Sequence, residues 1–527
     1  MSKRMVKICG LVLVVAGCMW GWSKEAYSLF IDGQGYYAAK GQMIYKPGFD
    51  GHSFKGMAHS VSLLGKVTAS DKLSLNVRFS LFKNPTEGYF GNEVSPQRCS
   101  KKTQTGDLES TGEVSEEECS GRHQDSLAPG YKNYVPLISE AYVEYASDYC
   151  ILQIGRRSRH WGMGAVINDG KTPFSYRGSI YDGISCEINP SKFQNFGFSF
   201  GYDVLADRGT SYMVGVGEDE VGEFNSGADN LRQFFVSVES GNRVSEPEAD
   251  FIHDIGLYFS WISGSADTSI KLADLYTMLK YKKLSFENEL IFRLGSSKDP
   301  SLARVGGIYS TETNDESNKV TAIGFVGGLS FTLYETGSLL APEEFKKSDY
   351  TAHLLALNYI YVPGDSDGAK PSYKDGEPKR DTKAEAISLN PNYKPALILF
   401  NSPFLSDTRV DGIYDPNAVM NTKLISLGYK YTDKSLMDIG VKFIGAWLNK
   451  TADSSAETYY TEENRPVVGM KSSKSLGYEL DLSFFRNENK YLSYGADLGI
   501  CIPGSTFKLD GGKKATVMLQ LSTIFSI

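Results

Sequence analysis

The sequence predicts an all-β chain: a transmembrane antiparallel up-and-down β-barrel of about 18 strands, with 16 as the alternative count. Three observations carry this prediction. Segments of alternating apolar and polar residues recur along the chain, short and long connections between them alternate, and the last segment stays apolar on one side up to its final residue. Such alternation places successive side chains on opposite faces of a strand.

The last stretch, residues 515–527, is the clearest of these segments. It reads ATVMLQLSTIFSI, and one of its faces carries Val517, Leu519, Leu521, Phe525 and Ile527. A strand that is apolar to its end has to be paired and covered, and a closed barrel does this by pairing the last strand with the first. The ending resembles the terminal strand of Gram-negative outer-membrane β-barrels, although those usually end in Phe and here Phe525 precedes the last residue by two.

Composition favours strands over helices. The chain has 527 residues with 41% hydrophobic and 12% aromatic content, including 32 Tyr, 28 Phe and 53 Gly. These residue types suit strands, tight turns and aromatic girdles. After the first residues no apolar run approaches the roughly 18 residues needed for a transmembrane helix. This criterion does not detect a membrane barrel, because barrel strands show only alternation of apolar and polar residues.

Residues 1–28 are predicted to be a cleavable signal peptide. A basic start with Lys3, Arg4 and Lys7 precedes an apolar stretch, Ile8 to Trp20, that is too short to span a bilayer. Small residues around Ala26 to Ser28 then predict a mature chain from Leu29. An alternative is lipidation at Cys18, because residues 15–18 resemble a lipoprotein cleavage site.

Removal of the predicted signal peptide, residues 1–28, makes the protein more acidic. This segment carries four basic residues and Glu25, so the formal charge changes from −8 to −11. A chain of this charge is not expected to bind nucleic acid.

Seven cysteines are present, of which Cys9 and Cys18 lie in the predicted signal peptide. Cys99 and Cys119 lie close together in a polar loop and are predicted to form a disulfide in an oxidising compartment. The remaining three are single strand residues that we expect to be unpaired: Cys150, Cys186 and Cys501.

From residue 29 onwards the whole chain is predicted to be one barrel, residues 29–527, without a second domain. Clear alternation covers residues 73–81, 196–203, 476–484 and 492–500. Short connections contain residues 70–71, 147–148, 432–433 and 487–489. Long connections lie near residues 84–136, 156–179, 205–229, 296–318, 363–421 and 449–472.

The connections separate a membrane barrel from a soluble β-sandwich, whose strands also alternate. Strict alternation of short and long connections is typical of a meander with one rim in the periplasm and the other outside the cell. Within the 363–421 connection, the apolar run Ala396 to Phe400 is either an extra strand or a packed piece of the loop.

The densest group of functional side chains follows the strand that we expect at residues 150–154. It contains Arg156, Arg157, Arg159 and Trp161, and Arg177 and Asp182 are expected where the same loop returns to the next strand. The third outer loop of several porins folds into the lumen. Arginines there would attract carboxylates, phosphates or sulfates, and Trp161 would stack on a sugar.

The alternative for these arginines is structural. They would then pair with lumen carboxylates such as Glu140 and Glu144 on the neighbouring strand. Both interpretations place the cluster inside the barrel.

Residues 140–188 resemble a pattern of outer-membrane porins and of polysaccharide-linked barrels, including alginate-export-like and capsule-assembly (Wzi-like) proteins. The pattern is a strand with Gly155 and Arg156, a Trp161-Gly162 turn, and a strand with Tyr181-Asp182-Gly183. The resemblance covers about 50 of the 527 residues. It implies passage or surface retention of anionic sugars.

Charged residues of both signs are expected on the lumen side. They are Arg78, Glu140, Glu144, Glu287, Glu289, Arg293, Asp438, Lys442, Glu479, Asp481 and Asp497. Strand side chains cannot fill so wide a barrel, so we expect a water-filled lumen that loops make narrower.

The function predicted from these features is that of a porin-like channel for passive diffusion of small, anionic or sugar-type solutes. A structural or adhesive surface barrel, or a polysaccharide-associated one with a plugged lumen, is the alternative. The expected partners are outer-membrane lipid and small solutes or polysaccharide, and the choice between a monomer and a homotrimer stays open.

No enzyme, cofactor or metal site is expected. No Gly-x-Ser-x-Gly nucleophile motif is present. Residues 364–368 have half the spacing of a calcium loop but lack its glutamate.

Overall fold

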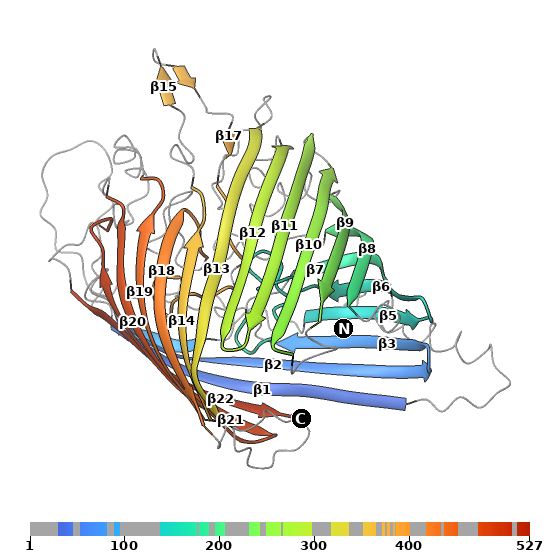
Figure 1. Cartoon of the computed structure of the whole chain (residues 1–527), viewed down its shortest axis with the longest axis horizontal. Coiled ribbons are helices and arrows are strands. Elements are labelled where there is room, and N and C mark those ends of the chain that lie inside the picture. The colour runs from blue at the N-terminus through green and yellow to red at the C-terminus, as the bar shows by residue number, and fades with distance from the viewer. Residues whose placement is uncertain are drawn as a thin grey trace, which may run out of the picture.

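The structure of the chain is a computed structural model (Figure 1). It describes residues 30–45, 53–81, 89–94, 137–175, 179–188, 195–205, 231–242, 249–264, 267–297, 318–336, 351–364, 372–374, 377–379, 383–384, 386–390, 392–400, 418–433, 437–451, 473–507 and 514–527. The predicted signal peptide, Cys99, Cys119 and Arg177 lie outside these residues. Within the described ranges no helix is long and apolar enough to cross a membrane.

Among the described residues twenty strands share one sheet, and two of them, β4 (Tyr89–Val94) and β17 (Lys383–Ala384), pair only with the long-loop ends of β2 and β13. The remaining 18 form the wall, which confirms the predicted count. A separate hairpin pairs β15 (Ser372–Lys374) with β16 (Glu377–Lys379).

In the wall each strand is antiparallel to its two neighbours. The first nine strands are β1 (Phe30–Tyr45), β2 (Ser53–Ser70), β3 (Leu73–Leu81), β5 (Leu137–Ala146), β6 (Cys150–Ser158), β7 (Ile180–Ile188), β8 (Phe196–Leu205), β9 (Arg232–Gly241) and β10 (Phe251–Gly264). The second nine are β11 (Thr268–Tyr281), β12 (Leu284–Ser297), β13 (Asn318–Thr336), β14 (Thr351–Tyr361), β18 (Thr422–Thr432), β19 (Met437–Leu448), β20 (Ser475–Asn489), β21 (Leu492–Pro503) and β22 (Thr516–Ser526).

The last strand closes the wall by pairing with the first. Tyr36 lies opposite Ser526, and Tyr45 lies opposite Val517 at the other end of the pairing. The Gly35 amide donates a hydrogen bond to the Ile527 carbonyl at 3.2 Å, and the Ile527 amide donates to the Gly35 carbonyl at 2.9 Å. β1 and β22 are accordingly neighbours in Figure 1. Closure removes the sheet edge that the apolar ending would otherwise expose.

The connections fall on two rims. The strand ends joined by residues 71–72, 147–149, 282–283, 433–436 and 490–491 form the short-turn rim, and those joined by 82–136, 159–179, 206–231, 298–317, 362–421 and 449–474 form the long-loop rim. Two connections depart from the predicted strict alternation: residues 337–350 join β13 to β14 on the short-turn side, and only residues 265–267 join β10 to β11 on the long-loop side. Most boundaries differ from prediction by one to three residues, and one of these differences moves candidate site residues. The third outer connection begins after Ser158 rather than at residue 156, because the pairing of β6 with β7 continues to Ser158 and Ile180.

The outer face of the wall is apolar. In β18, for example, Ile425 and Leu427 are 47% and 58% exposed, whereas the alternating residues Leu424 and Ser426 are buried. Exposed apolar residues recur on the other strands: Leu63, Phe79, Ile154, Phe200, Leu257, Leu275, Leu329, Leu357, Phe443, Leu482 and Leu521. Exposed tyrosines mark the short-turn rim: Tyr145, Tyr149, Tyr281, Tyr334 and Tyr491. Such a band flanked by aromatics is the lipid-facing surface of a membrane barrel.

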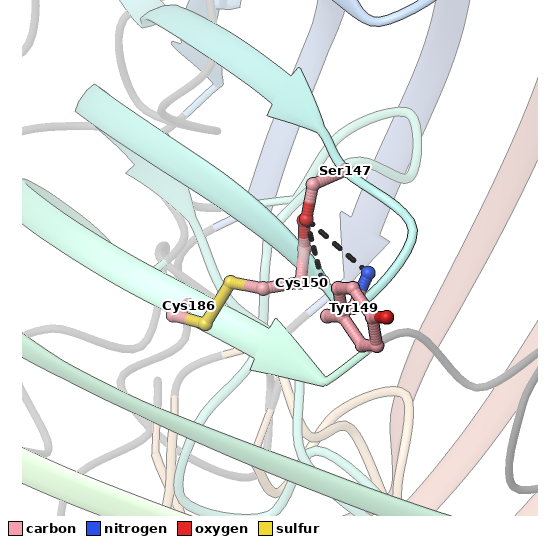
Figure 2. The surroundings of a disulfide bond; sticks show 4 residues. All are labelled: Ser147, Tyr149, Cys150 and Cys186. Carbon is pink, nitrogen blue, oxygen red and sulfur yellow. Dashed lines mark hydrogen bonds between the residues drawn. A yellow bond between two sulfur atoms is a disulfide. The ribbon is translucent and has the colours of Figure 1, made fainter.

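A disulfide joins Cys150 of β6 to Cys186 of β7 (Figure 2), so the expectation that both are unpaired is wrong. β6 and β7 are neighbours, and Cys186 lies opposite Leu152, two residues from Cys150 and on the same face. The turn before Cys150 is closed by the Ser147 hydroxyl, which accepts hydrogen bonds from the backbone amides of Tyr149 and Cys150. Cys501 is a free, buried thiol, as expected.

Candidate functional site in the barrel interior

Two stretches of long connections lie inside the barrel. We call residues 159–175, after β6, the first inner segment, and residues 386–390 and 392–400, between β14 and β18, the second inner segment. They touch each other, because the Asn390 amide donates to the Ala165 carbonyl at 2.7 Å and the Asn390 side chain donates to the Val166 carbonyl at 3.3 Å. The interior is therefore partly filled by loops, as we expected for the third outer loop.

The second inner segment packs into an apolar part of the lumen. Ile398, Leu399 and Phe400 are fully buried. Their surroundings include inward-facing apolar residues of the wall: Ile44, Ile291, Ala322, Val326, Ile360, Leu424, Ile444, Ala446, Leu476, Cys501 and Met518. The run Ala396 to Phe400 is thus a packed piece of the loop and not an extra strand, which settles the two alternatives.

A buried wall carboxylate holds the backbone of this segment. The amides of Ile398 and Leu399 donate to the two oxygens of Glu479 on β20, at 2.7 Å and 3.0 Å. The Lys442 ammonium of β19 donates to the Pro395 carbonyl at 3.2 Å. Backbone groups buried away from water have to be paired, and here charged wall residues pair them.

The first inner segment is held in a similar way by a carboxylate of β12, five strands from β20 around the wall. The Ala165 amide donates to Glu289 of β12 at 3.1 Å. Gly162 has φ +53°, and a Cβ atom at this position would lie 2.6 Å from the same carboxylate. The Trp161-Gly162 step is therefore the point where the chain turns closely against β12, and glycine is required there for both reasons.

Trp161 itself is a packing residue in this structure. Its side chain is 5% exposed, and its ring lies 5.6 Å from the ring of Tyr258, centroid to centroid, beside Phe235. The expectation that it offers a face to a sugar is not met by this conformation, because neighbouring side chains cover the ring.

Arg157 and Arg159 point into the barrel and share one carboxylate. Asp203 of β8, fully buried, accepts from Arg157 at 2.7 Å and from Arg159 at 3.0 Å. Arg159 also donates to the Tyr258 hydroxyl at 3.1 Å, and its guanidinium lies 3.5 Å from the ring centroid of Phe235. The pairing that we considered for the arginines therefore exists, but with Asp203 rather than with Glu140 or Glu144.

Arg156 is different, because it lies on the outer face. It pairs through two hydrogen bonds of 2.8 Å and 2.7 Å with Asp182, directly opposite on β7. Both follow the alternation of the exposed Ile154 and Ile184, two residues away on their strands. The expectation that the whole cluster lies inside the barrel is wrong for Arg156 and Asp182, because β6 remains a regular strand for four residues beyond the predicted end.

Glu140 is the centre of a second charged group. Its carboxylate accepts from Arg78 of β3 at 2.8 Å, from the Ser158 hydroxyl, and from Lys171 of the first inner segment at 3.1 Å. Lys171 also lies 3.9 Å from Asp169. Alternation along the strands places the other predicted lumen residues on the inner face too, so that expectation is confirmed.

A hollow with a mixed lining, in which Pro173 and Ile524 stand beside polar side chains, remains next to the first inner segment. It has a volume of about 620 Å³ and lies between that segment and the wall at β1, β21 and β22, towards the short-turn rim. Tyr36, Asp169, Lys171, Ser493 and Ser526 are among its lining residues. The Tyr36 hydroxyl donates to the Thr172 carbonyl at 3.4 Å, which fixes the segment to β1.

Tyr393 of the second inner segment packs, partly buried, against the apolar part of the lumen. Burial of the Tyr393 phenol in the second inner segment raises its pKa, and the nearby carboxylates of Glu289 and Glu287 raise it further. Within the described ranges no three His, Cys, Asp or Glu side chains are placed to hold a metal ion.

A wall of 18 strands that closes on itself, with an apolar outer face and charged residues inside, defines an outer-membrane β-barrel. No family model matches the sequence, and no curated protein matches it.

Solved structures of outer-membrane barrels are similar to the chain. Pseudomonas aeruginosa OprD has a TM-score of 0.44 and 10% identity, covering 95% of this chain and 97% of OprD. OccK5 (OpdH) of the same organism has a TM-score of 0.42 and 9% identity over 94% of this chain and 98% of its own. Escherichia coli Wzi, described as a carbohydrate-binding β-barrel involved in group 1 capsule assembly, has a TM-score of 0.40 and 9% identity over 93% and 84%. Similarity at this level carries no information about solutes.

Proposed function

We propose that the protein is an outer-membrane channel through which small polar solutes diffuse passively beside the first inner segment. The observation that carries this proposal is the hollow between that segment and β1, β21 and β22, whose mixed lining includes several hydroxyls and charged groups. Hydroxyls and charges of both signs line it, which suits a hydrated, sugar-type solute that forms hydrogen bonds more than a compact ion of one charge. The driving force is the concentration gradient alone.

We further propose that Arg157, Arg159 and Asp203 give the lumen a weak preference for anions. Two guanidinium groups against one carboxylate leave one net positive charge on this group of three residues. A unit charge about 10 Å from a solute in water contributes about 0.4 kcal/mol, which corresponds to about twofold in permeability. Arg156 is excluded from this role by its position on the outer face. Arg177, outside the described residues, stays a candidate from the sequence alone.

Single-channel recording in planar bilayers tests both proposals. The purified protein is expected to give discrete conductance steps. Arg159→Gln leaves the Arg157–Asp203 pair intact and is expected to lower the chloride-to-potassium permeability ratio about fourfold, because the anion loses an attraction and the cation loses a repulsion of the same size. Arg156→Gln is the matched control and should leave the ratio unchanged. An unchanged ratio in both variants would remove the arginines from the selectivity mechanism.

The second candidate is a structural or adhesive barrel with a sealed lumen, and the dry packing of the second inner segment favours it. Correctly folded protein that never conducts, over many insertions, would support this candidate against a channel. Binding of the folded protein to polysaccharide-coated surfaces would then be the measurement to make.

A further inference from the structure

Five neighbouring strands carry a continuous polar row on the outer face, next to the long-loop rim. Their register joins Arg232 to Ser263, Ser263 to Ser269, Ser269 to Ser296, and Ser296 to Lys319. These strands, β9 to β13, stand side by side in the green-to-yellow part of the wall (Figure 1). We call this row, together with Lys271 beneath it, the rim patch.

Alternation shows that the rim patch faces away from the lumen. Phe234 and Trp261, two residues from Arg232 and Ser263, are 43% and 45% exposed among the lipid-facing residues. Lys271 lies opposite Trp261 in the next row. The Trp261 indole donates to the Ser269 hydroxyl at 3.2 Å, so the aromatic ring joins the two rows.

The rim patch is positively charged. Arg232, Lys271 and Lys319 are all exposed, and within the described ranges none of them forms an ion pair. The second row consists of Phe234, Trp261, Lys271, Leu294 and Thr321, so neither row contains a carboxylate. Strands lie about 4.8 Å apart, so Arg232 and Lys319 are about 19 Å apart with Lys271 between them.

We propose that the rim patch binds the phosphate groups of glycolipid headgroups in the outer leaflet of the membrane. It lies where the wall changes from apolar to polar, which is the level of the headgroups, and an indole at this level is typical of a membrane interface. Three cations and three hydroxyls supply donors for several phosphate oxygens. The bound lipid covers β9 to β13 on the outside. This inference depends on the membrane position of the wall and not on the proposed channel activity.

A second copy of the chain is the other conceivable occupant. It would require a carboxylate-bearing surface to neutralise three cations, and a twofold contact of this patch with itself would bring like charges together. Charge complementarity therefore favours lipid phosphate.

The test measures binding of lipid A with two phosphates to the detergent-solubilised full chain by native mass spectrometry. Arg232→Ser, Lys271→Ser and Lys319→Ser together remove the three cations of the patch and are expected to weaken binding by about tenfold or more. Removal of the two phosphates from the lipid should weaken binding of the parent protein to a similar extent.

The matched control replaces Lys280, Lys283 and Lys490, exposed cations near the short-turn rim, with Ser. It should leave the affinity within about twofold of the parent value. Heat-modifiable migration in gels establishes that each variant is folded. Equal affinity of the triple variant and the parent, or equal binding of the phosphate-free lipid, would overturn the proposal. Loss of an oligomer in the triple variant without loss of lipid binding would assign the patch to a subunit contact instead.

Discussion

At the scale of single residues, the ion pairs of the wall differ mainly in their burial. The Arg157–Asp203–Arg159 group is buried, whereas Arg156 and Asp182 are more than one-third exposed. A buried charge that loses its partner bears the full cost of desolvation, while an exposed pair contributes little because water screens it.

Asp203→Asn should therefore destabilise the barrel by about 3–5 kcal/mol, because two buried guanidinium groups lose their counter-charge. The measurement is the free energy of unfolding from urea titration in lipid vesicles. The control is Asp182→Asn, for which a loss of about 0–1 kcal/mol is expected. Equal losses in the two variants would contradict the assigned positions of the two pairs.

Residue-scale prediction from sequence was correct about residue type and wrong about partners. The arginine-rich motif and the Trp161-Gly162 step can be seen in the sequence, and both do position the first inner segment. Asp203 was missed because it lies about 45 residues away on β8, and only the register of the sheet brings it to the arginines. Arg156 was misplaced because the end of β6 depends on pairing with β7, which local alternation around Gly155 does not reveal.

At the scale of elements, carboxylates of the wall hold the two inner segments in place by accepting hydrogen bonds from their backbone amides. Glu479 accepts two backbone amides, from Ile398 and Leu399. A glutamine at this position offers one oxygen and places an amide donor against the second backbone amide. One buried donor is then left unpaired, which costs about 1–3 kcal/mol.

Glu479→Gln should therefore loosen the second inner segment. We expect protease cleavage within residues 386–400 to become about tenfold faster or more, since cleavage of a native loop follows its opening equilibrium. If the barrel conducts, its conductance should rise in parallel. Glu144→Gln is the control, because Glu144 contacts Lys66 and Gln153 of the wall and not this segment. Unchanged cleavage in Glu479→Gln would show that apolar packing alone retains the segment.

The pairing of β6 and β7 gives another prediction at this scale. Peptide mapping without reductant should recover Cys150 and Cys186 in one linked fragment, and Cys501 should react with an alkylating reagent only after denaturation, because it is buried. The same map tests the predicted Cys99–Cys119 pair. Recovery of Cys150 and Cys186 as separately alkylated peptides would exclude the disulfide.

At the scale of the whole molecule, the closed wall and the apolar outer face depend on each other. Pairing of β1 with β22 leaves no free edge among the described wall strands, so the backbone groups along these two strands are paired with each other as a membrane wall requires. The outer side chains can then be apolar, because they contact lipid and not water.

Leu427→Arg tests this arrangement, because Leu427 is 58% exposed in the middle of β18. An arginine there should cost about 2–4 kcal/mol if Leu427 lies near the middle of the bilayer. Urea titration in lipid vesicles gives the value, and Lys423→Arg, at the long-loop end of the same strand, should be nearly neutral. A neutral effect of Leu427→Arg would mean that this face does not contact lipid.

The sequence by itself determined the class of fold, the 18 strands and the two kinds of connection. Side-chain alternation and turn residues are local properties, and a strand apolar to its last residue requires a partner strand. Only the tertiary structure decided which loop segments enter the lumen, that Glu289 and Glu479 hold them, that Asp203 joins two arginines, and that Cys150 meets Cys186. The physical reason is that these contacts join residues from different strands, and closure and register of the whole wall bring them within reach of one another.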